Sequence, residues 1–441
     1  MLRFTPDLDR RVLEVRVRVS GPVSDTLRLA VRLTLGDEVL ADDTYPATAA
    51  VVQRDIPLDG ARIQHERRRY LWSPDYPNLL DAEVRLLRAE ADGTGGTTVD
   101  TVRSYCGLRS VRAADRHFVL NGRGYPLRMV LAQNYWPASH LAAPDPDALR
   151  REVELVKELG FNGVRIHQKV EDPRFLAWCD RLGVLAWGEM PSALDFDPRT
   201  VRRLIREWLE VLERDVSSPA LVAWVPFNES WGVPNLEHDE AQRHAVRALY
   251  HLTKSIDPTR PVIGNDGWEH LASDIWGVHD YALDGATIRE RYGTAEAVER
   301  TLREIQPHYR SIALPDAHRR GEPVMLTECG GITDAPAPGE QWWGYSQASG
   351  PEALQARYGE LIGAILDCPA IVGFCYTQLT DTEQERNGLL TAERAPKADP
   401  AAIRAITTGP ARALPAEVIA NIQAASEVTA FGGGGGSTSG G

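Results

Sequence analysis

Two glutamates each end an apolar run, and both are candidates for acid–base chemistry. Glu229 ends LVAWVPFNE (221–229), and Glu328 ends PVMLTE (323–328). Hydrolysis of a glycosidic bond needs one carboxyl group to protonate the leaving oxygen and a second carboxylate to attack or to activate water. A lone glutamate at a strand end is more often a salt-bridge partner or a helix cap. A second glutamate in the same context, and Asn228 beside the first, favour catalysis.

Both glutamates belong to a series of eight short apolar runs that alternate with amphipathic, helix-like stretches such as PDALRREVELVKELG (146–160). This alternation predicts an α/β fold, a (β/α)₈ TIM barrel. A doubly wound open sheet is the alternative, because periodicity alone does not establish closure. The sequence has no GxGxxG or phosphate loop after any run, which argues against nucleotide binding. The eight runs are 127–134, 163–168, 184–189, 221–229, 261–266, 274–281, 323–328 and 371–376.

In such a barrel the active site lies at the carboxyl ends of the strands. The polar side chains that end the runs are therefore expected to face one mouth. They are Arg165, His167, Glu189, Asn228, Glu229, Asp266, His279, Tyr281, Glu328 and Tyr376. A purely structural, hydrogen-bonded role is equally compatible with His167 and His279. Trp231, in a loop, could stack on a sugar ring, although most tryptophans are core residues.

The chain is expected to have two domains and a tail. Residues 1–112 contain runs that alternate apolar with polar residues, such as LEVRVRV (13–19), and predict a small all-β, immunoglobulin-like sandwich. Residues 113–430 form the predicted barrel. Residues 431–441 are a Gly/Ser-rich, flexible tail that carries no fold information.

Composition excludes several classes of partner. The net charge of −13 disfavours binding to nucleic acid or to an anionic membrane, and no run is long enough to cross a bilayer. The five cysteines are scattered without a CxxC pair, so we expect neither a disulfide framework nor a zinc site. No cofactor and no metal are expected. The start of the chain lacks the apolar core of a secretory signal, which favours a cytoplasmic location. A homo-oligomer is left open.

Five segments, in this order, resemble glycoside hydrolase family 2, the family of β-galactosidases, β-glucuronidases and β-mannosidases. The Asn-Glu pair alone is a weak motif, whereas all five segments together are highly specific. The resemblance covers roughly residues 1–400. The segments are LWSPDYPNLL (71–80), FNGVRIHQKVEDPRFLAWCDRLGVLAWGEMP (161–191), WVPFNESWG (224–232), VMLTECGG (324–331) and GFCYTQLTDTEQERNGLLTAERAPK (373–397).

The resemblance implies a role for each matching residue. Glu229 would act as acid and then as base, and Glu328 would form a covalent glycosyl-enzyme. Asn228 would bind the sugar's 2-hydroxyl group. A nearby cation and a donated hydrogen bond would keep Glu328 ionised. The implied substrate-binding residues are Asn228, His167, Arg165, Tyr281, Tyr376 and Trp231.

The chain also departs from the family pattern. Family members usually carry an N-terminal jelly-roll domain before the sandwich, and this chain is expected to lack it. The expected function is a retaining exo-β-glycosidase, β-galactosidase-like, acting on a carbohydrate. The alternative is a truncated or degenerate member that binds carbohydrate with little turnover. Glu385, where glucuronidases have an asparagine that binds the uronate, disfavours a glucuronidase. Gln133 stands where family β-galactosidases have a histidine.

Overall fold

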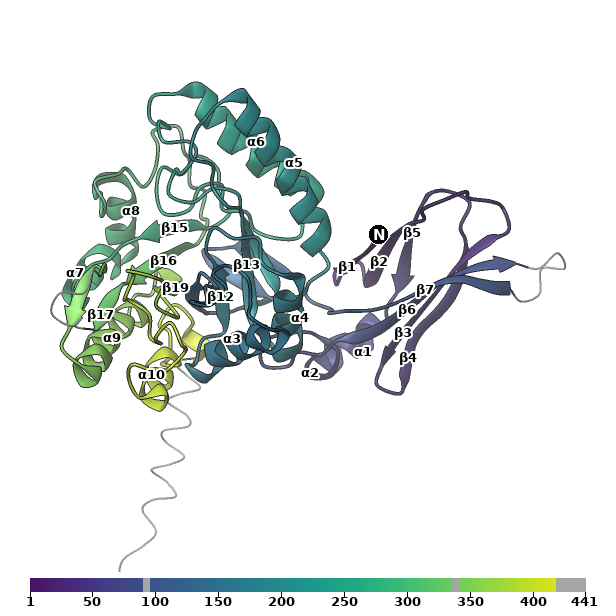
Figure 1. Cartoon of the computed structure of the whole chain (residues 1–441), viewed down its shortest axis with the longest axis horizontal. Coiled ribbons are helices and arrows are strands. Elements are labelled where there is room, and N and C mark those ends of the chain that lie inside the picture. Colours follow the sequence, from purple (N-terminus) through teal and green to yellow (C-terminus); the bar gives the residue numbers. More distant parts are fainter. Residues whose placement is uncertain (90–95, 335–341, 418–441) are drawn as a thin grey trace, which may run out of the picture.

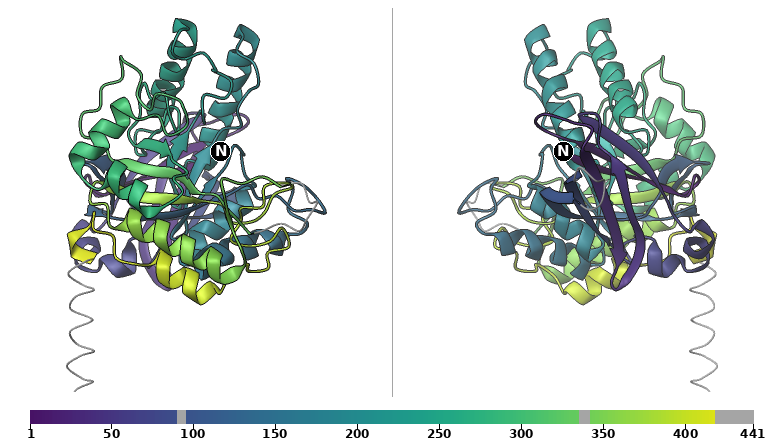
Figure 2. Two further views of the ribbon diagram at one scale, coloured as in Figure 1. Left: turned by 90° about the vertical axis from the view of Figure 1, so that its left-hand side faces the viewer. Right: turned by 90° about the vertical axis from the view of Figure 1, so that its right-hand side faces the viewer.

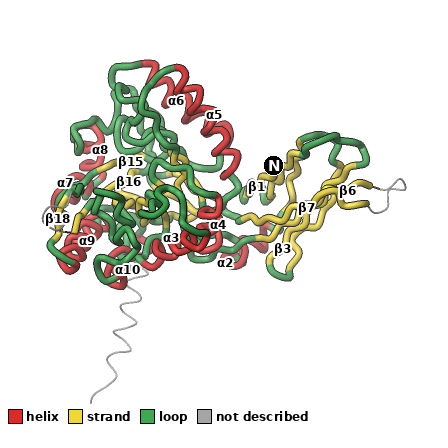
Figure 3. The backbone as a smooth tube through the Cα atoms, viewed as in Figure 1, coloured by secondary structure: helices red, strands yellow, loops and turns green. Residues whose placement is uncertain are grey.

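The computed structural model describes residues 1–89, 96–334 and 342–417. Antiparallel sheets from the N-terminal part lie beside a curled parallel sheet that is surrounded by helices (Figure 1). Figure 2 views the molecule from the parallel-sheet end and from the antiparallel-sheet end. Figure 3 shows that most helices gather around the parallel sheet. The predicted tail, 431–441, lies outside the described residues.

Two antiparallel sheets, in the orders β1-β2-β5 and β4-β3-β6-β7, build the N-terminal part. Apolar side chains alternate along the strands, and those of both sheets, such as Val15 and Leu29, bury one shared core. The expected antiparallel sheets are therefore confirmed, although two short helices between β5 and β6 were not predicted, and the immunoglobulin-like topology stays a prediction. The elements are β1 (Leu2–Asp7), β2 (Val12–Arg18), β3 (Leu27–Leu35), β4 (Glu38–Pro46), β5 (Val51–Pro57), α1 (Gly60–His65), α2 (Arg67–Tyr70), β6 (Leu80–Ala89) and β7 (Gly96–Cys106).

A small meander of β8 (Val111–Ala114), β9 (His117–Leu120) and β10 (Arg123–Gly124) precedes the parallel sheet. Phe118 and Leu120 of this meander are buried in the core of the barrel rather than in the N-terminal core. The domain boundary near residue 112 stays a prediction.

The parallel sheet has the order β14-β13-β12-β11-β19-β16-β15. The first of its strands along the chain, β11, pairs in parallel with the last, β19. That pairing curls the sheet back on itself, as in a TIM barrel, and is not the doubly wound alternative. The strands are β11 (Leu127–Ala132), β12 (Gly163–Ile166), β13 (Leu185–Glu189), β14 (Leu221–Val225), β15 (Trp276–His279), β16 (Val324–Gly330) and β19 (Ile371–Thr377).

The run 261–266, predicted as the fifth of eight strands, is not a regular strand. It lies along β14 with only isolated parallel bridges, Trp224 to Val262 and Asn228 to Asp266. Pro261 lacks an N–H group, and Ile263 makes an antiparallel bridge to Ser273 instead of a ladder to β15. The segment nevertheless runs beside β14 and the residues that follow it, so that Asp266 reaches the site.

Helices follow most of the strands, and four of them begin at an Asp-Pro dipeptide, as for α3 at Asp145. The aspartate accepts a hydrogen bond from a free backbone N–H of the first turn, and the proline fits the first helical position. These starts fix where each helix leaves the mouth of the barrel. The remaining elements are α3 (Pro146–Glu158), α4 (Pro173–Leu182), α5 (Pro198–Asp215), α6 (Glu240–Ile256), α7 (Gly285–Tyr292), α8 (Ala295–Glu304), β17 (Ile332–Asp334), β18 (Ser346–Ala348), α9 (Pro351–Leu366) and α10 (Pro400–Thr407).

The five cysteines are free thiols, and all of them are buried. Burial raises the pKa of Cys106 to about 12, so that this thiol stays protonated at neutral pH. Across the described ranges, none of the helices combines the length and the apolar character that crossing a bilayer requires.

Candidate active site

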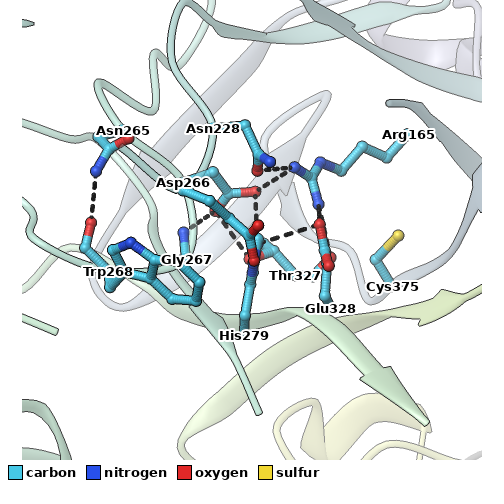
Figure 4. A network of polar contacts seen from close by, with 12 residues as sticks. Arg165, Asn228, Asn265, Asp266, Gly267, Trp268, His279, Thr327, Glu328 and Cys375 are labelled. Carbon is cyan, nitrogen blue, oxygen red and sulfur yellow. Dashed lines mark hydrogen bonds and ion pairs between the residues drawn. The ribbon is translucent and has the colours of Figure 1, made fainter. Parts of the chain in front are cut away.

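The parallel strands bring polar side chains from six segments to one end of the barrel (Figure 4). The carboxyl ends of parallel strands meet at one edge, so residues far apart in the sequence become neighbours there. The structure thus brings most of the predicted strand-end residues to one mouth. The residues gathered there include Arg165, Glu189, Asn228, Asp266, His279 and Glu328.

Arg165 is the hub of this cluster. Its side chain is completely buried, and its Nε donates to Glu189 at 2.8 Å. Its two terminal nitrogens donate to Glu328 Oε1 at 2.7 Å and to Asn228 Oδ1 at 2.5 Å. Asp266 Oδ2 lies 3.3 Å from the same guanidinium. A planar fork with five donors satisfies several carboxyl and amide oxygens at once, which a lysine could not do.

Glu328 is held as a carboxylate. Arg165 occupies its Oε1, and the Tyr281 hydroxyl donates to its Oε2 at 2.5 Å. Burial alone would raise the pKa of Glu328. The positive charges of His279, Arg165 and His167, together with the Tyr281 hydrogen bond, outweigh burial and lower the pKa to about 2. Glu328 is therefore ionised at neutral pH, as a nucleophile must be.

Glu229 lies in a tight turn directly after β14. Its backbone φ is 53° and that of Ser230 is 57°, which is the left-handed region that non-glycine residues rarely adopt. Glu229 N donates to Asp266 O at 2.9 Å, and Ser230 N donates to Asn265 Oδ1 at 3.0 Å. These bonds stabilise a conformation of the kind that clusters at functional sites.

The two catalytic candidates are close to each other. One oxygen of Glu229 and one of Glu328 lie within 4.8 Å of each other, and a nitrogen of His279 lies within the same distance of both. The Glu229 side chain is 20% exposed, whereas that of Glu328 is 6% exposed. The outer carboxyl group thus meets solvent at the mouth, and the inner one lies at its floor.

His279 is the residue whose importance the sequence did not reveal. Its Nδ1 lies 2.7 Å from Glu229 Oε1, and its Nε2 lies 3.5 Å from Glu328 Oε1. Burial opposes a charge on the imidazole. The negative charges of Glu328, Asp266 and Glu229 nevertheless raise the pKa of His279 to about 10. Its position at a strand end was the only signal, and that signal did not distinguish this role from a structural one.

Three further predicted site residues, His167, Trp231 and Asn228, differ in how deeply they are buried and in what they contact. His167 Nδ1 lies 3.4 Å from Glu189 and 3.8 Å from Glu328, inside the cluster. Trp231 is 52% exposed in the turn that follows Glu229. Asn228 accepts from Arg165, and its Nδ2 is buried without a partner among the described residues, so one donor is free for a ligand.

Tyr376 is not brought to the site. It packs edge-on against Tyr358 of α9, with ring centroids 5.0 Å apart, on the helix-facing side of β19. Side chains alternate along a strand, so its neighbour Thr377 faces inward, and its Oγ1 lies 3.2 Å from the Tyr281 hydroxyl oxygen. The expectation that Tyr376 lines the pocket is therefore wrong, and the next residue, Thr377, faces the site instead.

Glu385 forms a polar corner beside the cluster. Its Oε2 accepts from Gln133 Nε2 at 2.8 Å and from Gln378 Nε2 at 2.9 Å. Burial raises the pKa of Glu385 although both amides favour its charged form, and it is near enough to His167 and Glu328 to respond to their charges. The corner therefore adds a carboxyl group close to the place where a substrate would bind.

Glu229, His279 and Glu328 also have the spacing of metal ligands. Glu328, however, already accepts hydrogen bonds from Arg165 and Tyr281 through both of its oxygens. The Arg165 guanidinium would also repel a bound cation at this short range. This donor set suits acid–base chemistry better than metal binding, and the expectation that no metal is required stays a prediction.

Replacing Arg165 should destabilise the fold severely. Arg165→Met leaves the buried Glu189 and Asp266 without their cation, which costs about 3–5 kcal/mol when one partner of a buried pair is removed. The free energy of unfolding in urea measures the loss. Arg165→Lys is the matched control, because it keeps the charge without the fork and should lose less. Equal stability of Arg165→Met and the wild type would contradict the role of Arg165 as a hub.

Comparison with known proteins shows which family the barrel sequence matches and which solved structures have a similar fold. Residues 111–328 match the family described as glycosyl hydrolases family 2, TIM barrel domain. An FMN-binding β-glucuronidase from Facaelibacterium prausnitzii L2-6 superposes with a TM-score of 0.70 at 18% identity, over 93% of this chain and 61% of that one.

Two further solved structures show the same fold. A family 2 β-galacturonidase from Eisenbergiella tayi bound to galacturonate has a TM-score of 0.67 at 19% identity, over 94% of this chain and 72% of that one. A putative β-galactosidase from Bacteroides fragilis has a TM-score of 0.71 at 17% identity, over 92% of this chain and 60% of that one. The chain thus spans only part of these longer proteins, and at such identities the likeness shows the fold.

Proposed function

Because the barrel of this chain is a TIM-barrel domain of glycoside hydrolase family 2, we propose that the chain is a retaining exo-β-glycosidase. The observation that carries this proposal is the distance between oxygens of Glu229 and Glu328, which lie within 4.8 Å of each other. Retaining enzymes place the two carboxyl groups about 5–5.5 Å apart, whereas inverting enzymes need about 6.5–9.5 Å to admit a water molecule between carboxylate and sugar. The spacing here supports the retaining arrangement.

In the first step the Glu328 carboxylate attacks the anomeric carbon while Glu229 gives its proton to the glycosidic oxygen. The bond from the anomeric carbon to that oxygen breaks, and the aglycone leaves as an alcohol. Arg165 and Tyr281 hold Glu328 ionised for the attack. The free Nδ2 of Asn228 is available to bind a hydroxyl group of the sugar.

In the second step water attacks the glycosyl-enzyme. Glu229, now a carboxylate, takes the proton of that water, and the ester to Glu328 breaks. The 20% exposure of the Glu229 side chain fits this step, because the water must reach Glu229 from the mouth. Both carboxyl groups return to their starting states, and the sugar is released with its anomeric configuration retained.

For the sugar we propose a neutral hexoside, β-galactoside-like, rather than a uronide. Glu385 and Glu328 both present carboxyl groups at the pocket, and a uronate would bring a further negative charge into a partly buried site. Two of the similar structures are a β-glucuronidase and a β-galacturonidase. The Glu385 carboxyl group, held by Gln133, supports a preference for an uncharged sugar in this chain.

The experiment that tests the function is a hydrolysis screen of the purified chain against aryl β- and α-glycosides, with Glu328→Ala as the blank. Turnover of one β-glycoside, lost in the blank and with the β-anomer appearing first by NMR, is the expected result. No turnover on any member, with a cooperative unfolding transition intact, would favour the alternative of a carbohydrate-binding protein.

A matched pair of substrates tests whether the Glu385 carboxyl group disfavours a uronide. An aryl β-galactoside and the corresponding β-galacturonide differ only at C6, as a hydroxymethyl group against a carboxylate. We expect kcat/KM to favour the galactoside by about 100-fold or more, because like charges oppose binding of the uronide. Glu385→Gln should narrow that ratio by about tenfold without raising activity on the galactoside. An unchanged ratio in Glu385→Gln would remove Glu385 from the specificity argument.

A further inference from the structure

His279 lies between the two catalytic carboxyl groups and is itself removed from water. Its side chain is 0% exposed. Its Nδ1 is 2.7 Å from Glu229 Oε1, while its Nε2 lies 3.5 Å from Glu328 and 3.6 Å from Asp266. Figure 4 shows the imidazole directed toward the same carboxyl groups that Arg165 contacts. One ring nitrogen thus serves the outer carboxyl group, and the other faces the inner, ionised ones.

The surrounding backbone is shaped to hold this ring. Gly267 has a φ of +99°, and a Cβ atom at Gly267 would lie 2.7 Å from His279 Nδ1. A Cβ atom at Gly277 would lie 1.7 Å from Asp266 Oδ1. Side chains at these two positions would displace either the imidazole or the carboxylate beside it. The Trp268 ring packs edge-on against the His279 imidazole, with the two ring centroids 5.6 Å apart.

We propose that His279 is a positioning residue for the acid/base. Its Nδ1 fixes Oε1 of Glu229, which leaves Oε2 free for the leaving group, and the two residues share the proton that the leaving group receives. This inference rests on the proposed retaining mechanism. It adds to that mechanism the statement that the pair, and not Glu229 alone, is the unit that gives and takes the proton.

The proton balance is simple. Before the reaction the pair holds one transferable proton, either between Glu229 and a neutral imidazole or on the imidazolium beside a carboxylate. In the first step the proton reaches the Glu229 carboxyl group, where it is not already there, and a turn of that group presents the protonated oxygen to the glycosidic oxygen, which takes the proton. The pair is left as a carboxylate beside a neutral imidazole. In the second step Glu229 receives a proton from the attacking water, which restores the pair. No other donor or acceptor is required.

The charges around the imidazole favour the proton-bearing form. Glu229 after β14, Asp266 in the 261–266 segment and Glu328 on β16 all face it. Burial lowers the pKa values of His308 and His270, and the nearby charge of His279 lowers them further. Arg165 contacts Asp266 as well. Because the pKa of His279 is raised, its proton is present below that pKa and is lost as the pH rises through it.

The test uses two substitutions at one position. His279→Asn places an amide nitrogen near the place of Nδ1, so it can still hold Glu229 but cannot carry the proton. His279→Ala removes both abilities. The pH profile of kcat/KM is measured for each variant on an aryl glycoside with a poor leaving group and on one with a good leaving group. The control is His270→Asn, because His270 is equally buried but bonds to Ser273 and Gly277 O.

We expect the basic limb of the profile to move at least about one pH unit lower in both His279 variants, since the macroscopic pKa belongs to the pair. His279→Ala should also lose about 10²-fold or more in kcat/KM on the poor leaving group and far less on the good one. His270→Asn should lower the melting temperature without moving the limb. Equal losses on both substrates with an unmoved limb would overturn the inference.

A second readout does not need turnover. The ¹⁵N chemical shifts of the imidazole, assigned through their loss in His279→Asn, report its titration directly. In Glu229→Gln the midpoint should fall by about one unit or more, because a shared proton loses its anionic partner. A midpoint unmoved by Glu229→Gln would also overturn the inference. A wild type that is inactive on every glycoside would count against the proposed function instead, and the titration would still decide the role of His279.

Discussion

Glu328→Ala is expected to lower kcat/KM by about 10⁴-fold or more on every β-glycoside that the wild type cleaves, because the carboxylate that forms the glycosyl-enzyme is removed. The loss should not depend on the leaving group, since the attack on the anomeric carbon is missing in all cases. The matched control is Glu213→Ala, which removes an exposed glutamate of α5 and should leave kcat/KM unchanged.

A trapping experiment identifies the atom that is attacked. A 2-deoxy-2-fluoro glycoside with a good leaving group should inactivate the wild type and add one sugar mass to the peptide that contains Glu328. The added mass on a different peptide would reassign the nucleophile. No added mass, together with release of the α-anomer as first product, would replace retention by inversion.

The same residue has a signature in stability. The pKa of Glu328 falls from its ordinary 4.5 to about 2 in the folded chain, so its ion pairs stabilise the fold above about pH 4.5 and are lost as the pH falls toward 2. Glu328→Gln keeps the shape but has no charge to titrate. Its free energy of unfolding should therefore decline less steeply than that of the wild type between these two pH values.

The barrel could be predicted from the sequence because its strands are buried on both faces. Such strands appear as continuous apolar runs, and a polar residue at the end of a run marks the mouth. Seven of the eight runs are regular strands. The run 261–266 differs because Pro261 and the bridge from Ile263 to Ser273 prevent a ladder on both sides, and that effect is decided by the tertiary pairing.

The site could be predicted as a set of residues but not as a set of contacts. Arg165, Asn228, Glu229 and Glu328 come together as the strand ends required. Tyr376 shows the limit, because strand register decides which of two neighbours faces inward, and a shift of one residue exchanges them. His279 shows a second limit, since its importance arises from three carboxylates on other segments.

Glu229→Ala is expected to be selective in its damage. On an aryl glycoside with a poor leaving group, kcat/KM should fall by about 10²–10⁴-fold, because the departing oxygen must leave without a proton. On a dinitrophenyl glycoside, whose leaving group is stable as an anion, the first step should be nearly unaffected and the second should become slow. Glycosyl-enzyme would then accumulate, with a burst of released phenol and a low KM. Equal losses on both substrates would contradict the acid/base role.

Azide distinguishes the roles of Glu229 and Glu328, because the alanine variant of each residue should form a different anomer of the glycosyl azide. Removing Glu229 opens space on the face where water attacks the glycosyl-enzyme, so azide should enter there and give a β-glycosyl azide with restored turnover. Removing Glu328 opens space on the opposite face, so azide should attack the substrate itself and give an α-glycosyl azide. The anomer found with each variant therefore reports which side of the sugar that carboxyl group occupied. The same anomer from both variants would mean that the two roles are wrongly divided between Glu229 and Glu328, even if both residues are essential.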